Sequence, residues 1–184
     1  MVHSFQLILA AVFTVLLGQS EGQTQPTGDD LWQKINLLPV CFEAKGNKPG
    51  ELTYLSSDVL VGAMKLVHQS GTIRCAANPA YDSKWGCNVP GTLNLLNVVV
   101  TDKHNNVVYP LQKYMSKNHA GGLWYNLPFI HTLYSKELVF TNYLDPFFLP
   151  QHSTLRIWYG EDLKDYYESD NFGRVCVDVF IHAL

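Results

Sequence analysis

The sequence predicts an all-β fold, namely an antiparallel β-sandwich of jelly-roll type with one short N-terminal helix and two disulfides. Three observations predict it. The segment 175–181 alternates between apolar residues and others, which is typical of a strand with one buried face. About eight short apolar segments are separated by turn-forming residues. Finally, 9 Phe, 10 Tyr and 4 Trp provide ample material for a hydrophobic core.

The first 22 residues have the pattern of a secretory signal peptide. An apolar run from Leu7 to Leu17 is too short to span a bilayer, and Ser20 and Gly22 are small residues suited to a cleavage site after Gly22. The rival interpretation is a buried N-terminal strand or helix, but this run has no polar face to show to water. Residues 23–30 are then a flexible lead-in, and residues 31–184 form one domain.

The elements of this domain follow from local signals along the chain. A short helix is expected at residues 29–39, because Asp29 or Asp30 would cap it and Pro39 would end it. The remaining signals favour strands, with residues 92–111 as a hairpin around the turn at His104. The expected strands are 40–44, 59–67, 71–76, 92–102, 107–111, 133–143, 154–160 and 175–181.

Four cysteines in an exported chain favour two disulfides. Sequence alone permits three pairings. We prefer Cys75–Cys87, which closes a local loop, and Cys41–Cys176, which ties the first strand to the last and restricts the unfolded chain most. A zinc site is the rival interpretation, although the chain has no Cys-x-x-Cys pair.

The segment between the last two expected strands concentrates carboxylates. Calcium takes about 6–8 oxygen ligands, and a bound divalent ion would relieve the repulsion between neighbouring acids. Gly173 would let the backbone turn tightly just before the last strand. The alternative is that these acids only form a solvated loop. The predicted calcium ligands are Asp162, Asp165, Asp170 and Asn171.

Two pairs of aromatic residues are candidates for contact with a sugar ring. Trp124 and Tyr125 follow a Gly-Gly pair, and Tyr166 and Tyr167 lie within the acidic segment. Aromatic faces can stack on the rings of sugars. The alternative is that these side chains pack in the core or at its rim.

Several classes of function are excluded or disfavoured by composition and motifs. The formal net charge is −3 and no run of Lys or Arg occurs, which argues against nucleic acid as a partner. No second apolar run approaches membrane length. Metalloprotease and serine-hydrolase motifs are absent and the cysteines are expected to be oxidised, so we do not expect an enzyme.

The C-terminal 30 residues also carry a resemblance. The run Leu155–Leu163 (LRIWYGEDL), the turn pattern E-x-D-N-x-G at 168–173 and the segment CVDV at 176–179 look like a terminal segment of secreted cnidarian proteins. These include uncharacterised skeletal organic matrix proteins of stony corals. The resemblance implies an exported extracellular or skeletal-matrix protein, and it implies no activity. With 16 acidic against 13 basic residues, a folded matrix component is expected rather than a mineral template.

The same segment is similar to calcium-dependent galactose-binding sandwich lectins. In that resemblance Asp170 and Asn171 occupy the dipeptide that coordinates the ion, and Asp162 or Asp165 the preceding acid. We therefore expect a secreted structural or interaction component of an extracellular matrix, which calcium could stabilise. The alternative is a calcium-dependent carbohydrate-binding module. The expected partners are extracellular matrix proteins or glycans.

Overall fold

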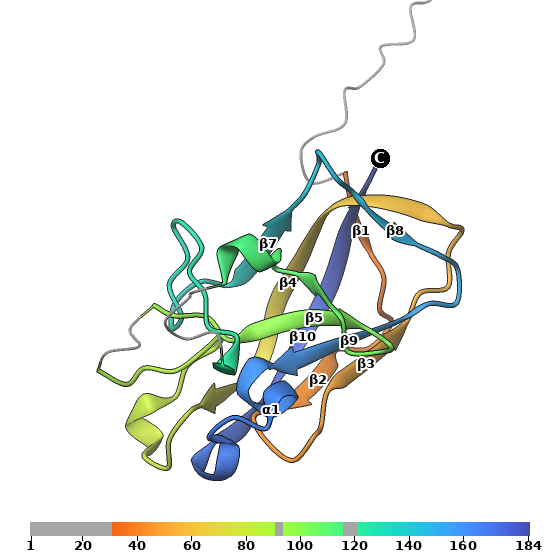
Figure 1. Cartoon of the computed structure of the whole chain (residues 1–184). Coiled ribbons are helices and arrows are strands. Elements are labelled where there is room, and N and C mark those ends of the chain that lie inside the picture. The colour runs from red at the N-terminus through yellow and green to blue at the C-terminus, as the bar shows by residue number, and fades with distance from the viewer. Residues whose placement is uncertain (1–30, 91–93, 116–120) are drawn as a thin grey trace, which may run out of the picture.

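The computed structural model describes residues 31–90, 94–115 and 121–184. The predicted signal peptide at 1–22 and the lead-in at 23–30 lie outside the described residues. The described chain consists mainly of antiparallel strands, as the sequence predicted (Figure 1). None of its helices is long and apolar enough to cross a membrane.

The larger sheet is built around two long strands, β4 (Val59–Arg74) and β10 (Phe172–Ala183), which pair along their length. The free edge of β10 is covered by β1 (Trp32–Lys34) and β2 (Val40–Glu43). The free edge of β4 is covered by β7 (Glu137–Thr141) and β8 (Phe147–Leu149).

The smaller sheet has four strands in the order β3-β9-β5-β6. Its strands are β3 (Gly50–Thr53), β9 (Thr154–Tyr159), β5 (Val98–Asp102) and β6 (Val107–Tyr109). Short helical turns connect the strands: η1 (Pro79–Tyr81), η2 (Gln112–Tyr114), α1 (Gly160–Lys164) and η4 (Glu168–Asp170). The hairpin predicted at 92–111 is formed by the shorter pair β5 and β6, and residues 92 and 93 lie outside the described residues.

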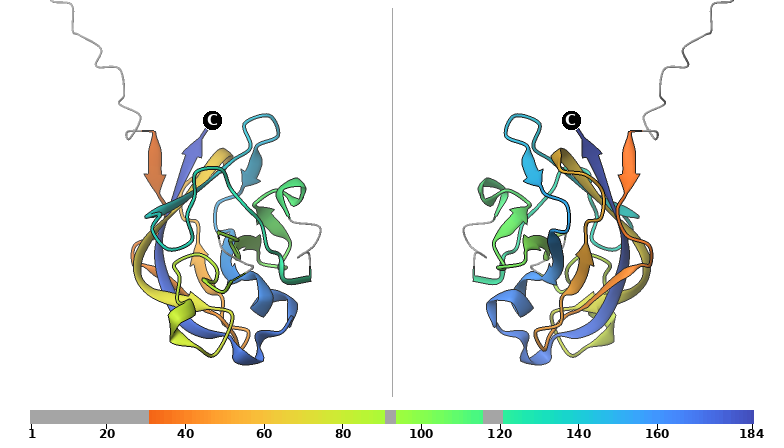
Figure 2. Two further views of the ribbon diagram at one scale, coloured as in Figure 1. Left: turned by 90° about the vertical axis from the view of Figure 1, so that its left-hand side faces the viewer. Right: turned by 90° about the vertical axis from the view of Figure 1, so that its right-hand side faces the viewer.

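The two sheets lie face to face around one hydrophobic core (Figure 2). The alternation predicted for the last strand is confirmed, because Val175, Val177, Val179 and Ile181 are all buried. The smaller sheet contributes Val98–Val100, Leu155 and Ile157 to the same core. Burying such a side chain contributes roughly 1.5–3 kcal/mol, so this alternation fixes which face of β10 points inward. The jelly-roll connectivity stays a prediction.

Both preferred disulfides are present. Cys41–Cys176 joins register partners on β2 and β10 across 135 residues of sequence. Cys75–Cys87 closes a 12-residue segment that follows β4. The zinc alternative is therefore excluded for these four residues, since none of them is free.

The predicted helix at 29–39 is wrong over the residues that the structure describes. Residues 32–34 form β1, with Trp32 opposite His182 and Lys34 opposite Phe180 on β10. Asn36 then fastens the chain to the same edge, since its side chain accepts from the Val179 N–H at 2.6 Å and donates to Asp178 Oδ1 at 2.9 Å. Pairing with an available strand edge has overridden the local helix signal.

The strands predicted at 59–67 and 71–76 are one continuous strand, β4. Gly71 lies at the point where a break was expected, in a left-handed conformation with φ of 82°. A Cβ at this position would collide with the Arg174 carbonyl of β10. The glycine therefore permits a close strand approach rather than ending the strand.

Candidate functional site

The predicted site lies in the connection between β9 and β10, where α1 and η4 pack against the turn at residues 44–48. We call residues 160–172 the acidic corner, which occupies the lower end of the molecule in Figure 1. The Gly160 N–H donates to the Asn97 carbonyl at 2.6 Å. A Cβ on Gly160 would lie 2.6 Å from the Gly122 carbonyl oxygen, so only glycine lets α1 begin this close to the neighbouring loop.

Glu161 is buried and serves as a hub of the corner. Its carboxylate accepts from Trp124 Nε1 at 3.1 Å and from Asn171 Nδ2 at 3.0 Å. Its backbone N–H donates to Asn97 Oδ1 at 3.0 Å. Burial raises the pKa of Glu161, although the hydrogen bonds from Asn171 and Trp124 oppose the rise. This carboxylate holds three segments of the chain together and is not available to a ligand.

Asp162 is fully buried and fixes the facing turn. Its two oxygens accept from the backbone N–H groups of Asn47 at 2.8 Å and Lys48 at 3.1 Å. A hydrogen bond between the Glu168 carboxyl and Asp162 raises the pKa of Glu168. The partner atoms of Asp162 lie more than 100 residues away in sequence, so Asp162 ties the corner to the β2–β3 turn.

The four predicted calcium ligands divide into an inward and an outward pair. Asp162 and Asn171 are buried, whereas Asp165 and Asp170 are exposed. Asn171 Nδ2 donates to the Ala44 carbonyl at 3.2 Å, and its Oδ1 is buried without a hydrogen-bond partner. Over the described ranges, no three His, Cys, Asp or Glu side chains gather into a group that could hold a metal ion. The three predicted carboxylate ligands are therefore not gathered into one group, and calcium binding stays a prediction.

The predicted aromatic contacts divide in the same way. Trp124 and Tyr125 are core residues, since Trp124 is 4% exposed and the Tyr125 hydroxyl donates to the Val98 carbonyl inside the protein. Their predicted role in ligand contact is corrected, because a buried ring presents no face to a ligand. Tyr166 and Tyr167 are 41% and 77% exposed. Their rings meet edge to face, with centroids 4.7 Å apart.

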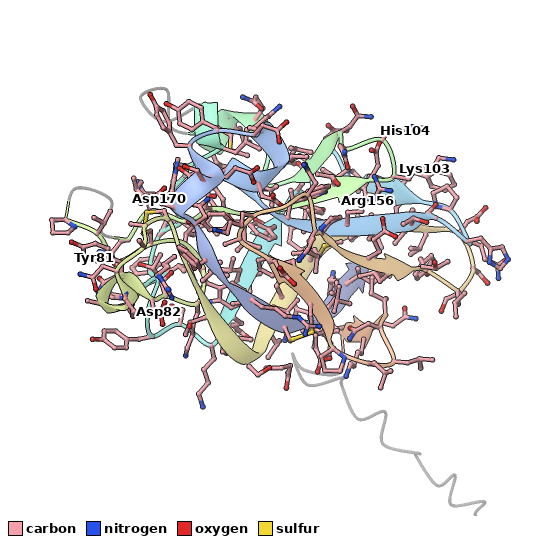
Figure 3. All side chains as sticks on the ribbon, turned by 90° about the horizontal axis from the view of Figure 1, so that it is seen from below. Tyr81, Asp82, Lys103, His104, Arg156 and Asp170 are labelled. Carbon is pink, nitrogen blue, oxygen red and sulfur yellow. A yellow bond between two sulfur atoms is a disulfide. The ribbon has the colours of Figure 1, made fainter. Side chains whose placement is uncertain are left out.

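The exposed surface of the corner is wider than the predicted residues. Phe172 is partly exposed, and Lys45 Nζ lies 3.8 Å from the centre of its ring. Arg74 stacks near the same ring and forms an ion pair with Asp82 at 2.7 Å. Figure 3 shows Asp82 and Asp170 on the same side of the molecule. Exposed rings, carboxylates and cations therefore share this end.

Sequence reasoning missed two features. Asn97, which holds α1 through its carbonyl and its side chain, stands in a predicted strand and carries no local signal of this role. The second feature is a cavity of about 420 Å³ at the β5–β6 and β8–β9 loops, lined among others by Asp102, Lys103, His104 and His152. The turn at 104–106 was predicted, but its spatial neighbour at 150–153 could not be deduced from sequence spacing.

Comparison with known proteins gives one strong match. Neither family models nor curated proteins match the chain. Among solved structures, AJLec, a lectin from the sea anemone Anthopleura japonica, is similar with a TM-score of 0.75 and 40% sequence identity. The match covers 83% of this chain and 97% of AJLec. The chain belongs to the same protein family as AJLec.

Proposed function

We propose that this protein is an extracellular carbohydrate-binding protein, and that the outer face of the acidic corner contacts the glycan. This outer face consists of the exposed residues Asp165, Tyr166, Tyr167 and Asp170. The observation that carries the proposal is the 40% identity to a sea anemone lectin over nearly the whole of that lectin. Two disulfides support the extracellular location, because disulfides persist in oxidising compartments.

The chemistry of the outer face suits a sugar. The carboxylates of Asp165 and Asp170 can accept hydrogen bonds from sugar hydroxyls, and such charge-assisted bonds are stronger than neutral ones. Tyr167 offers an aromatic face, whose partial negative charge attracts the C–H groups of a sugar ring. The buried bonds of Glu161 and Asp162 hold this face in place before a ligand arrives, which lowers the entropy lost on binding.

Two narrower statements accompany the proposal. The match to a lectin favours carbohydrate binding over a structural role in a skeletal organic matrix, and the matrix role stays a prediction. That role predicts co-purification with demineralised skeleton or with other matrix proteins, and no response to free sugars. A requirement for calcium stays a prediction as well. It is tested by measuring glycan binding in millimolar calcium and again after addition of a chelator, which should abolish binding if calcium is required.

The test is a glycan array probed with the full chain expressed in secreting cells. We expect the wild-type protein to bind a defined set of glycans. Tyr167→Ala and Asp170→Ala should each weaken this binding by about three- to tenfold, which corresponds to roughly 0.7–1.4 kcal/mol.

Matched controls are available elsewhere on the surface. Tyr134 is 73% exposed, close to the 77% of Tyr167, and Asp145 is an exposed acid in another loop. Tyr134→Ala and Asp145→Ala should leave binding unchanged. Failure of the folded wild-type protein to bind any glycan would refute the proposed function. Equal losses in the corner and control variants would refute the assignment to the corner.

A further inference from the structure

A second polar site lies away from the acidic corner. Figure 3 shows Lys103, His104 and Arg156 together at one side of the molecule, well separated from Asp170. The cavity of about 420 Å³ lies here, between the loop that joins β5 to β6 and the loop that joins β8 to β9. Asp102 and Leu155, which are register partners on β5 and β9, both line it. We call this cavity the hairpin cleft.

The first wall of the hairpin cleft is fixed by Asp102. Its carboxylate accepts from the backbone N–H groups of His104 at 2.7 Å and Asn106 at 2.9 Å, and from Asn106 Nδ2 at 2.8 Å. Burial acts to raise the pKa of Asp102, but these hydrogen bonds together outweigh it and lower the pKa. Arg156 also donates to the Lys103 carbonyl at 2.9 Å. The carboxylate in the cleft is therefore already occupied by its own loop.

The second wall is fixed by contacts with residues 54–58. The Gln151 N–H donates to Asp58 Oδ1 at 2.8 Å, and Gln151 Nε2 donates to the Leu55 carbonyl at 3.0 Å. The His152 N–H donates to the Tyr54 carbonyl at 2.7 Å. Both walls are thus held by hydrogen bonds that do not use the side chains of His104 or His152. A preformed cleft of this kind loses little entropy when a ligand enters.

The free polar groups of the cleft include a cation and two imidazole rings, and the uncharged hydroxyl and amide groups of its lining carry no negative charge. Across the part of the chain that the structure describes, Lys103 Nζ and the His152 ring have no hydrogen-bond or ion-pair partner. The His104 ring has only an electrostatic interaction with Asp102. Arg156 nearby is ion-paired with Glu51 at 2.6 Å. Since the one acid among the described lining residues is already hydrogen-bonded, the cleft is matched to a ligand that supplies acceptors or negative charge.

An exposed ring completes the cleft. Phe148, on β8, is 54% exposed and lines the cavity with the free donors. A phenyl face contributes nothing to an isolated inorganic anion, but it can stack on the C–H face of a sugar ring. The combination of the unpaired Lys103 cation and imidazole donors with an exposed ring favours a ligand that has both an anionic group and an apolar ring face.

We propose that the hairpin cleft binds an anionic substituent of a glycan, either a sulfate or a carboxylate, through Lys103, His104 and His152. Phe148 packs on the sugar ring that carries this group. The proposal rests on the proposed function only in taking the ligand to be a glycan, and it concerns a different site. The two sources of the negative charge share one recognition chemistry, so the experiment must separate them.

The test measures binding of matched oligosaccharides that are neutral, sulfated or uronic-acid-containing, together with inorganic sulfate and polyglutamate. The wild-type protein should bind at least one class of anionic oligosaccharide more tightly than its neutral counterpart. Lys103→Ala combined with His152→Ala should weaken that binding at least tenfold and leave neutral glycans unaffected. Phe148→Ala should weaken binding of the anionic oligosaccharide and leave any binding of inorganic sulfate unchanged.

Two variants serve as controls. Lys136→Ala removes an exposed lysine from another loop and should change nothing, whereas Tyr167→Ala alters the acidic corner and should spare the anionic preference. Preference for sulfated or for uronic acid ligands identifies the anion. Equal affinity for neutral and anionic glycans, or an anionic preference that survives the double variant, would overturn the cleft site alone. Equal binding of polyglutamate would overturn the glycan assignment, and no glycan binding of any kind would overturn the proposed function as well.

Discussion

The acidic corner and the hairpin cleft both contain carboxylates, yet the two regions use them differently. In the corner, Glu161 and Asp162 are buried and hold segments that are distant in sequence. In the cleft, the Asp102 carboxylate is hydrogen-bonded within its own loop, and neither Lys103 Nζ nor the His152 ring has a hydrogen-bond or ion-pair partner among the described residues. A local density of charged residues therefore does not identify a ligand site. What matters is which polar groups remain free once the fold has formed.

The sharpest test of this difference is removal of a buried acid. Asp162→Ala would leave two backbone N–H groups without their acceptor, so it should lower the free energy of unfolding by about 2–5 kcal/mol. Asp165→Asn, only three residues away, is exposed and keeps a residue type that tolerates the left-handed φ of 48° at this position, so it should change the free energy of unfolding by less than about 0.5 kcal/mol. Denaturant unfolding of both variants measures this. Similar losses in the free energy of unfolding for the two variants would show that the buried and exposed acids of the corner contribute equally to stability.

The pH dependence of stability should have opposite signs in the two regions. Burial raises the pKa of Glu161, so the folded state holds this proton more tightly than the unfolded chain. Its contribution to stability therefore rises as the pH falls from neutral through the raised pKa, and it levels off below the ordinary value of 4.5. Hydrogen bonds lower the pKa of Asp102, so its contribution is present above 3.8 and is lost as the pH falls further.

Thermal unfolding across pH 7 to 3 measures this contrast. The wild-type protein gains stability from Glu161 when the pH falls to mildly acidic values, and Glu161→Gln should not show this rise in Tm. The wild-type protein loses the contribution of Asp102 at the acidic end, and Asp102→Asn should not show this fall in Tm. Tm differences should be compared at each pH, because other carboxylates such as Glu168 also contribute. Parallel curves for the wild type and both variants would contradict the opposite roles of these carboxylates.

The smallest effect concerns the outer face of the corner. A Cβ on Gly121 would lie 2.6 Å from the Tyr166 ring, which is the movable end of a partly exposed side chain. Gly121→Ala should therefore displace Tyr166 and cost less than about 1 kcal/mol of stability. Glycan binding at the corner should fall, while the anionic preference of the hairpin cleft should persist. Loss of both would indicate that the two regions are not independent.

Much of the fold could be predicted because its signals are local. The period-two pattern at 175–181 assigned the inner face of β10, and the cysteine positions led to both disulfides. The helix predicted at 29–39 was wrong because local signals do not decide the structure of this segment. Its signals were local, whereas residues 32–34 are governed by the edge of β10, which lies nearly 150 residues further along the chain.

Local patterns along the chain were enough to predict the strand character, the disulfide pairing and the acidic connection before the last strand. The packing of α1 and η4 against the turn at 44–48, which local patterns do not encode, buries Asp162 and Asn171 and leaves Asp165 and Asp170 exposed. The tertiary structure also brought Lys103 and His152 to one cavity from two separate loops. The physical reason is that burial and hydrogen-bond partners come from segments far apart in sequence, and no spacing along the chain encodes them directly.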